Sequence, residues 1–143
     1  MKRIIVSLFV YAGLSTLAVA ASTHSRECSN ASLRGAYGFQ TSGIIVPVGT
    51  PRGNIGRWVF DGAGKFTNAV TVNDNGTIIP VTDAGTYTVN ADCTGTIVPD
   101  SGGSLEIVLV DGGNEFHLLR TDPPNWVMLF SVAKKQFTAN DER

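Results

Sequence analysis

The sequence predicts an all-β domain, an antiparallel up-and-down barrel of eight to nine strands with one disulfide. Three observations support this prediction. Short β-rich segments are separated by regular Gly, Asn and Asp turn signals, apolar residues alternate along those segments, and two cysteines form an isolated pair. No stretch after residue 21 sustains the apolar period of a helix.

Turn signals divide the chain from Gly35 to Phe137 into short segments. Glycine supplies the positive φ that tight hairpin turns require, and Asn and Asp tolerate it. Examples are Asn75-Gly76, Asp83-Ala84-Gly85 and Asp111-Gly112-Gly113. Between the signals we expect strands at 35–46, 54–61, 65–73, 77–82, 85–91, 94–98, 104–110, 114–120 and 125–133.

Alternation supports individual strands. Leu105, Ile107 and Leu109 lie on one face of the segment 104–110, and a second strand has an apolar face made by Trp126, Met128, Phe130 and Val132. Threonines at alternate positions are typical of the solvated face of an antiparallel sheet; they include Thr67, Thr71, Thr86, Thr88, Thr94 and Thr96.

An immunoglobulin-like sandwich is the competing fold. That sandwich places a Trp about a dozen residues after its first Cys and a Tyr two residues before its second. Here Trp58 follows Cys28 by 30 residues and Tyr87 precedes Cys93 by six. An unbroken series of hairpins therefore favours a barrel, which also removes exposed sheet edges.

The first 21 residues have the pattern of a secretory signal peptide. Lys2 and Arg3 precede an apolar run from Ile4 to Ala20 with a small-residue exit. We expect residues 1–21 to be cleaved, 22–34 to form an N-terminal segment, 35–137 to form the barrel and 138–143 to be a polar tail. A retained signal anchor is the alternative. With cleavage the protein has no stable membrane span and is secreted or periplasmic.

Charge and cysteine content limit the partners. Without the leader, nine Lys and Arg face twelve Asp and Glu, a formal charge near −3. This balance argues against nucleic acid and anionic membrane surfaces, which need a basic patch. Cys28 and Cys93 are expected to form a disulfide worth roughly 4 kcal/mol; the alternative, two free thiols that act as metal ligands or a nucleophile, lacks a CxxC or a nearby His.

Three blocks of sequence, residues 28–39, 60–64 and 85–96, resemble a group of small exported bacterial proteins, mostly uncharacterised. Each cysteine falls inside one of these blocks. The resemblance implies a bacterial source, a barrel similar to the calycin or allene oxide cyclase type, and a Cys28–Cys93 bridge. It implies no activity, and no catalytic motif of the plant cyclases is matched.

Glu106 and His117 are the candidate acid or base groups. A strand carboxylate such as Glu106 is either solvated on the outside or buried inside with a raised pKa, where it could move a proton on an apolar ligand. His117 is the one histidine in the predicted barrel and has no Ser–Asp or Cys partner at a triad spacing. The carboxylates and this histidine form no metal-ligating pattern, so we expect no metal and no cofactor.

The predicted function is the binding of a small apolar or amphipathic molecule by a monomer. The candidate ligand-binding residues are Arg57, Trp58, Tyr87, Glu106 and Trp126, with Arg57 suited to an anionic head group or to packing on Trp58. Two alternatives stay open: an isomerase or cyclase that uses Glu106 or His117, and a non-catalytic surface or matrix protein whose aromatic residues only fill the core.

The segment 44–53 is the longest irregular stretch between expected strands. Its apolar residues, two prolines and Arg52 suit a semi-rigid lid over a cavity. The alternative is a long hairpin that packs on the barrel wall.

Overall fold

The computed structural model describes residues 27–122 and 127–137. These residues form a closed barrel of eight antiparallel strands with almost no helix, which confirms the predicted fold class. The expected signal peptide, the polar tail and Trp126 lie outside the described residues. No helix within the described part of the chain is both long and apolar enough to cross a membrane.

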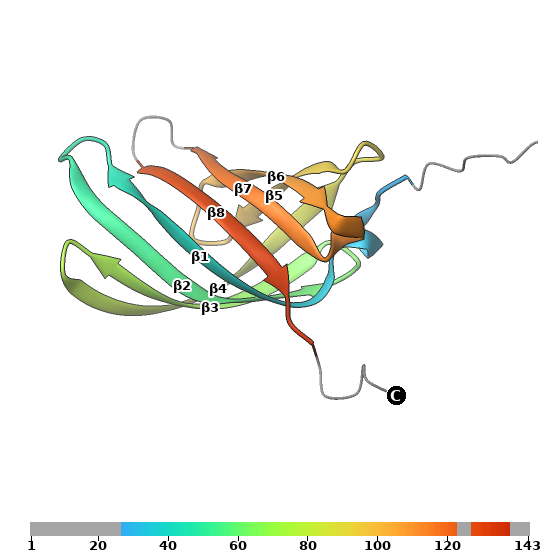
Figure 1. The fold of residues 1–143 in the computed structure, drawn as a ribbon, viewed down its shortest axis with the longest axis horizontal. Helices are drawn as coiled ribbons and strands as arrows, with labels where there is room; N and C mark the ends of the chain where they lie inside the picture. The colour runs from blue at the N-terminus through green and yellow to red at the C-terminus, as the bar shows by residue number, and fades with distance from the viewer. Residues whose placement is uncertain (1–26, 123–126, 138–143) are drawn as a thin grey trace, which may run out of the picture.

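Each strand pairs with the next in sequence, and β1 pairs with β8 to close the barrel (Figure 1). The single-turn helix η1 (Asn30–Ser32) precedes the first strand, and a second single-turn helix, η2 (Asp111–Gly113), connects the sixth strand to the seventh. The strands are β1 (Arg34–Ile45), β2 (Thr50–Asp61), β3 (Lys65–Asp74), β4 (Thr77–Val89), β5 (Thr94–Pro99), β6 (Ser104–Val110), β7 (Glu115–Asp122) and β8 (Val127–Lys135).

The expected turn at residues 83–85 is absent, so the predicted strands 77–82 and 85–91 join as β4. Gly85 is extended rather than left-handed, and a Cβ there would lie 2.2 Å from the carbonyl oxygen of Val98 and 2.8 Å from the ring of Phe66. This glycine therefore permits close packing inside a strand and does not form a turn.

The segment 44–53 is not a lid. β1 extends to Ile45 and β2 begins at Thr50, and these two residues are cross-strand partners. Pro51 lies within β2, opposite Ile44. The segment is thus the tip of a long hairpin with a short turn at residues 46–49, as in the alternative that the sequence left open, but its apolar residues Ile44, Val46 and Val48 are exposed and do not pack on the barrel wall.

The hydrophobic core lies toward the end of the barrel where the chain enters. Its fully buried side chains include Tyr37, Phe60, Tyr87 and Phe116. Their rings meet edge to face, with centroids 5.1 Å apart for Phe60 and Tyr87 and 5.6 Å apart for Phe60 and Phe116. We call the strand face that carries these residues the inner face. The aromatic residues therefore fill this half of the barrel.

Residues 28–33, which precede β1 and which we call the plug, close this end of the barrel, the plugged end. Leu33 is completely buried in the core. The Tyr87 hydroxyl donates to the carbonyl oxygens of Asn30 and Leu33, at 3.0 and 2.9 Å, and the amide of Val89 donates to Asn30 Oδ1 at 2.8 Å. These bonds satisfy polar groups that the plug would otherwise bury without partners.

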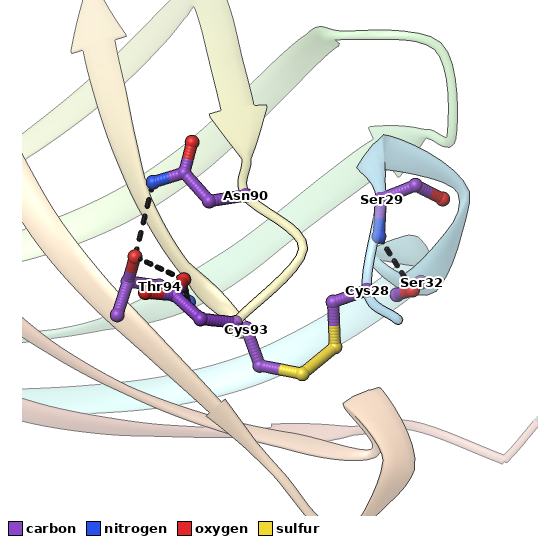
Figure 2. Close-up of a disulfide and its surroundings, with 7 residues drawn as sticks. Cys28, Ser29, Ser32, Asn90, Cys93 and Thr94 are labelled. Carbon is purple, nitrogen blue, oxygen red and sulfur yellow. Dashed lines mark hydrogen bonds between the residues drawn. A yellow bond between two sulfur atoms is a disulfide. The ribbon is translucent and has the colours of Figure 1, made fainter. Parts of the chain in front are cut away.

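The predicted Cys28–Cys93 disulfide is present and fastens the plug to the turn between β4 and β5 (Figure 2). The two Cα atoms are 4.9 Å apart. The Cys28 amide also donates to the carbonyl of Ala91 at 3.1 Å. Cys93 has a positive φ of 68° within a turn that Asp92 and Thr94 brace by side-chain hydrogen bonds.

The opposite end, which we call the open end, is formed by the turns of the β1–β2 and β3–β4 hairpins (Figure 1). The four strands of these hairpins have 10 to 13 residues, whereas β5 and β6 have six and seven. β5 pairs only with Gly85–Val89 of β4. The first half of β4 therefore has β3 on one side and no described strand on the other.

Pro80 lies on this unpaired edge of β4. The Ala84 carbonyl accepts from the Asp100 amide, so the main-chain groups of Ala84 point away from β3. Main-chain direction alternates along a strand, so the nitrogen of Pro80 points the same way. A proline costs no ladder hydrogen bond at this position and blocks the addition of another strand.

Candidate functional site

The structure does not bring the predicted ligand-binding residues together. Trp58 and Tyr87 point inward and are 4% and 2% exposed. Arg57 and Glu106 lie on the outer wall and are exposed. Trp126 lies outside the described residues. The five residues therefore do not form one site in the described part of the barrel.

Tyr87 and its neighbour Tyr37 have structural roles in the core. The Tyr37 hydroxyl donates to the Gly113 carbonyl at 2.5 Å, and Tyr87 holds the plug. Burial disfavours the phenolate, so the pKa of each tyrosine lies above its ordinary value of 10.0. Both hydroxyls are occupied by main-chain carbonyls, which argues against direct ligand contact by either.

Glu106 and His117 face solvent on the outer wall, so neither acts inside the barrel. The inward positions beside Glu106 are taken by Leu105 and Ile107. His117 Nε2 lies 3.3 Å from Glu115 Oε1, and Lys134 Nζ lies 3.0 Å from Glu115 Oε2. The acid–base hypothesis required a group on the inner face, and these two side chains are on the other one.

An open depression of about 960 Å³ includes both Glu106 and His117 in its lining, together with Thr41 and Asn54 of the inner face. Its apolar lining includes Ile55, Val108 and Phe130, which are 63%, 49% and 60% exposed. Exposed apolar residues gathered on a surface are a possible contact site. Glu106 and His117 are both exposed, so this depression is a surface feature and not an enclosed cavity.

A different feature distinguishes the inner face beyond the aromatic core: it becomes polar toward the open end. Five polar atoms there are buried and have no hydrogen-bond partner among the described residues. They are Thr41 Oγ1, Arg52 Nε, Asn54 Oδ1, Trp58 Nε1 and Asn68 Oδ1. Buried polar atoms in native proteins are almost always bonded to protein, water or ligand, so this group is the candidate site.

Strand register places these residues on three neighbouring strands. Thr41 of β1 is the cross-strand partner of Asn54 of β2, and Trp58 of β2 is the partner of Asn68 of β3. Arg52 lies two positions beyond Asn54 on the same face. Together they follow the inner face from the edge of the aromatic core toward the open end. We call these five residues the polar cluster.

Aromatic rings form the floor of the polar cluster. The Trp58 ring lies 4.7 Å from that of Phe66 and 5.6 Å from that of Phe39, measured between centroids. Trp58 thus has its apolar surface packed in the core, while its indole N–H remains without a protein acceptor. An apolar floor with a few polar groups above it is the composition of a small-molecule site.

Access to this face is possible beside β4. Val81 and Ile79 share the inner face with Val70 and Val72, which are their partners on β3. Yet Val81 and Ile79 are 38% and 40% exposed, whereas Val72 is 4% exposed. Because no described strand covers the first half of β4, its inner face is open to solvent.

Sequence reasoning missed four members of the polar cluster: Arg52, which it assigned only to the expected lid, and Thr41, Asn54 and Asn68. For the last three the signal was present, because each shares its strand face with an aromatic residue, Phe39, Trp58 or Phe66 respectively. Polar residues at the inward-facing positions of a strand are unusual, since burial of a polar side chain without a hydrogen-bond partner costs free energy. The sequence-based prediction placed polar strand residues on the solvated face, which overlooks these exceptions to the alternation.

Comparison of the chain with family models, curated proteins and solved structures finds no match. The candidate site therefore rests on the geometry of this barrel.

Proposed function

We propose that this protein is exported and binds a small amphipathic molecule at the open end of its barrel. The polar end of the ligand would occupy the polar cluster, and its apolar part would lie against Val81 and Ile79. The observation that carries the proposal is the set of five buried polar atoms without partners. The leader pattern and the disulfide support export to an oxidising compartment.

The energetic argument is direct. A buried donor or acceptor without a partner costs about 1–3 kcal/mol, whereas an apolar group of the same shape costs nothing comparable. A barrel that only needed a stable interior would gain stability from Val in place of Thr41. Retaining hydroxyl, amide and indole groups at the open end serves a partner that bonds to them.

The location can be tested with N-phenylnaphthylamine, an uncharged apolar fluorophore with one N–H group. We expect its fluorescence to rise saturably with the wild-type protein. Val81→Lys should abolish this rise, because it places a long charged side chain at the accessible part of the inner face. Val98→Lys is the matched control, since Val98 is 45% exposed but lies on the outer wall.

Two outcomes would overturn the proposal. The first is the absence of saturable fluorescence with the wild-type protein. The second is a loss of fluorescence in Val108→Lys but not in Val81→Lys, which would place the apolar part of the ligand against the exposed residues around Val108 and not against Val81 and Ile79. Export is tested separately: N-terminal sequencing of the protein recovered outside the cytoplasm should begin at Ser22, and an intact Met1 would contradict cleavage.

A further inference from the structure

We infer that the polar end of the ligand is an uncharged, hydroxyl-bearing group such as a glycerol or sugar moiety. This inference rests on the proposed function and goes beyond it by naming the chemistry of the ligand. It follows from two properties of the inner face at the open end: its charged side chains already contact other groups of the protein, and four of the five unpaired atoms belong to the neutral side chains of Thr41, Asn54, Trp58 and Asn68.

Toward the open end, the described charged side chains of the inner face contact other groups of the protein. Arg52 Nη1 lies 3.8 Å from Asp74 Oδ2. Asp83 accepts from the Ser101 hydroxyl at 2.5 Å and from the Ala84 amide at 2.9 Å. Arg120, also on this face, donates to the Gly102 carbonyl at 3.2 Å.

A charged ligand group would therefore find no counter-charge that is not already engaged. Moving a charge from water into a partly buried site is costly unless it meets an opposite charge and hydrogen bonds. A carboxylate would reach the unpaired Nε of Arg52 only beside the negative charge of Asp74, which repels it, and an ammonium group beside Asp74 would meet the positive charge of Arg52. A neutral group avoids both costs.

The unpaired atoms specify what that neutral group must do. Asn54 Oδ1 and Asn68 Oδ1 accept hydrogen bonds, Trp58 Nε1 and Arg52 Nε donate, and Thr41 Oγ1 does either. A hydroxyl group both donates and accepts, so two or three hydroxyls match this mixture. A carboxylate only accepts and would leave both Asn oxygens without donors. A quaternary ammonium group forms no hydrogen bonds at all.

The test compares three amphiphiles with matched decyl-length chains: monodecanoylglycerol, decanoate and decyltrimethylammonium. Each is titrated below its micelle concentration into the full barrel at neutral pH, with heat as the readout. We expect monodecanoylglycerol to bind at least tenfold more tightly than either charged amphiphile. Equal or tighter binding of decanoate would overturn this inference but leave the proposed function standing. Failure of all three to bind would overturn both.

A pair of Asn variants on one strand locates the effect. Asn68→Leu removes an inner-face acceptor, whereas Asn73→Leu removes an acceptor at an exposed outer position of β3, where Asn73 Oδ1 accepts from the Gly76 amide of the β3–β4 turn at 2.8 Å. We expect Asn68→Leu to lower the affinity for monodecanoylglycerol about tenfold and to leave that for decanoate unchanged. Asn73→Leu should change neither. Equal effects of the two variants, or unchanged binding by Asn68→Leu, would overturn the assignment.

Thr41→Val is a second variant that tests the same site without loss of folding. The change keeps the side-chain shape and removes an unpaired hydroxyl, so the variant should unfold at the same or a higher urea concentration than the wild type. Weaker monodecanoylglycerol binding by this stable variant supports the inference. Wild-type affinity in the stable variant would contradict a role for Thr41 in binding the hydroxyl groups.

Discussion

Removal of the Cys28–Cys93 disulfide should lower the free energy of unfolding by about 4 kcal/mol. The bridge joins residues separated by 65 positions. In the chain-entropy model, a loop of that length raises the free energy of the unfolded chain by about 4 kcal/mol at room temperature. For a domain of this size the loss corresponds to a fall of roughly 15 °C in Tm.

The assay is urea unfolding of the oxidised wild type and of a variant carrying both Cys28→Ser and Cys93→Ser. Because the bridge acts on the unfolded chain, the variant should also show a larger m value, as its unfolded state exposes more surface. The native barrel should remain intact. Its plug keeps the Tyr87 bonds to Asn30 and Leu33 and the Val89 bond to Asn30.

A loss below about 1 kcal/mol with an unchanged m value would refute this reasoning. Such a result would mean that the bridge only fastens the plug locally. Hydrogen exchange of the Val89 amide separates the two cases, since it donates to Asn30 in the plug. Faster exchange at Val89 alone indicates local release, whereas faster exchange throughout the core strands indicates global destabilisation.

Three further predictions concern the core and the unpaired edge. Tyr37 and Tyr87 have pKa values raised by burial above 10.0, so stability should be complete below pH 10.0 and fall as the pH rises through the native pKa; phenolate absorbance that matches an unfolded control would contradict this. Gly85→Ala should lower the free energy of unfolding by about 1–3 kcal/mol, because its Cβ would lie 2.2 Å from a carbonyl oxygen. The control Gly38→Ala should lower it less, since a Cβ there meets only a side chain at 3.4 Å. Equal urea midpoints of the two variants would show that β4 relaxes to accept the methyl group. Pro80→Thr adds an outward N–H to the unpaired edge and should produce concentration-dependent self-association in sedimentation velocity, whereas unchanged sedimentation would assign no protective role to this proline.

The strand pattern was predictable because hairpin turns and alternation are local properties. Asn75-Gly76 and Asp111-Gly112-Gly113 are turns as expected, and Asn75 and Asp111 both adopt positive φ. Gly85 was misread, because the sequence cannot distinguish a glycine required by a turn from one required by close packing. The carbonyl of Val98 that requires it comes from another strand.

The predicted site residues do not come together in the described barrel for a related reason. Trp58 is correctly part of the aromatic interior, but Glu106 and His117 face outward, and which face of a strand is buried depends on its neighbours. The polar cluster depends even more on tertiary structure. Asn68 becomes an unpaired buried group only because β2 and β3 place it beside Trp58 beneath a partly open wall.

The sequence by itself determined the class of fold, the approximate strands and the cysteine pair. Turn residues and apolar alternation are properties of short segments, and two cysteines can form only one intramolecular pair. Tertiary structure alone decided which residues face the interior, where the core ends and which end remains open. Those properties arise from register and from unequal strand lengths: β5 pairs with only the last five residues of β4, from Gly85 to Val89. That mismatch exposes Ile79 and Val81, which share the inner face with the buried polar cluster where we place the ligand.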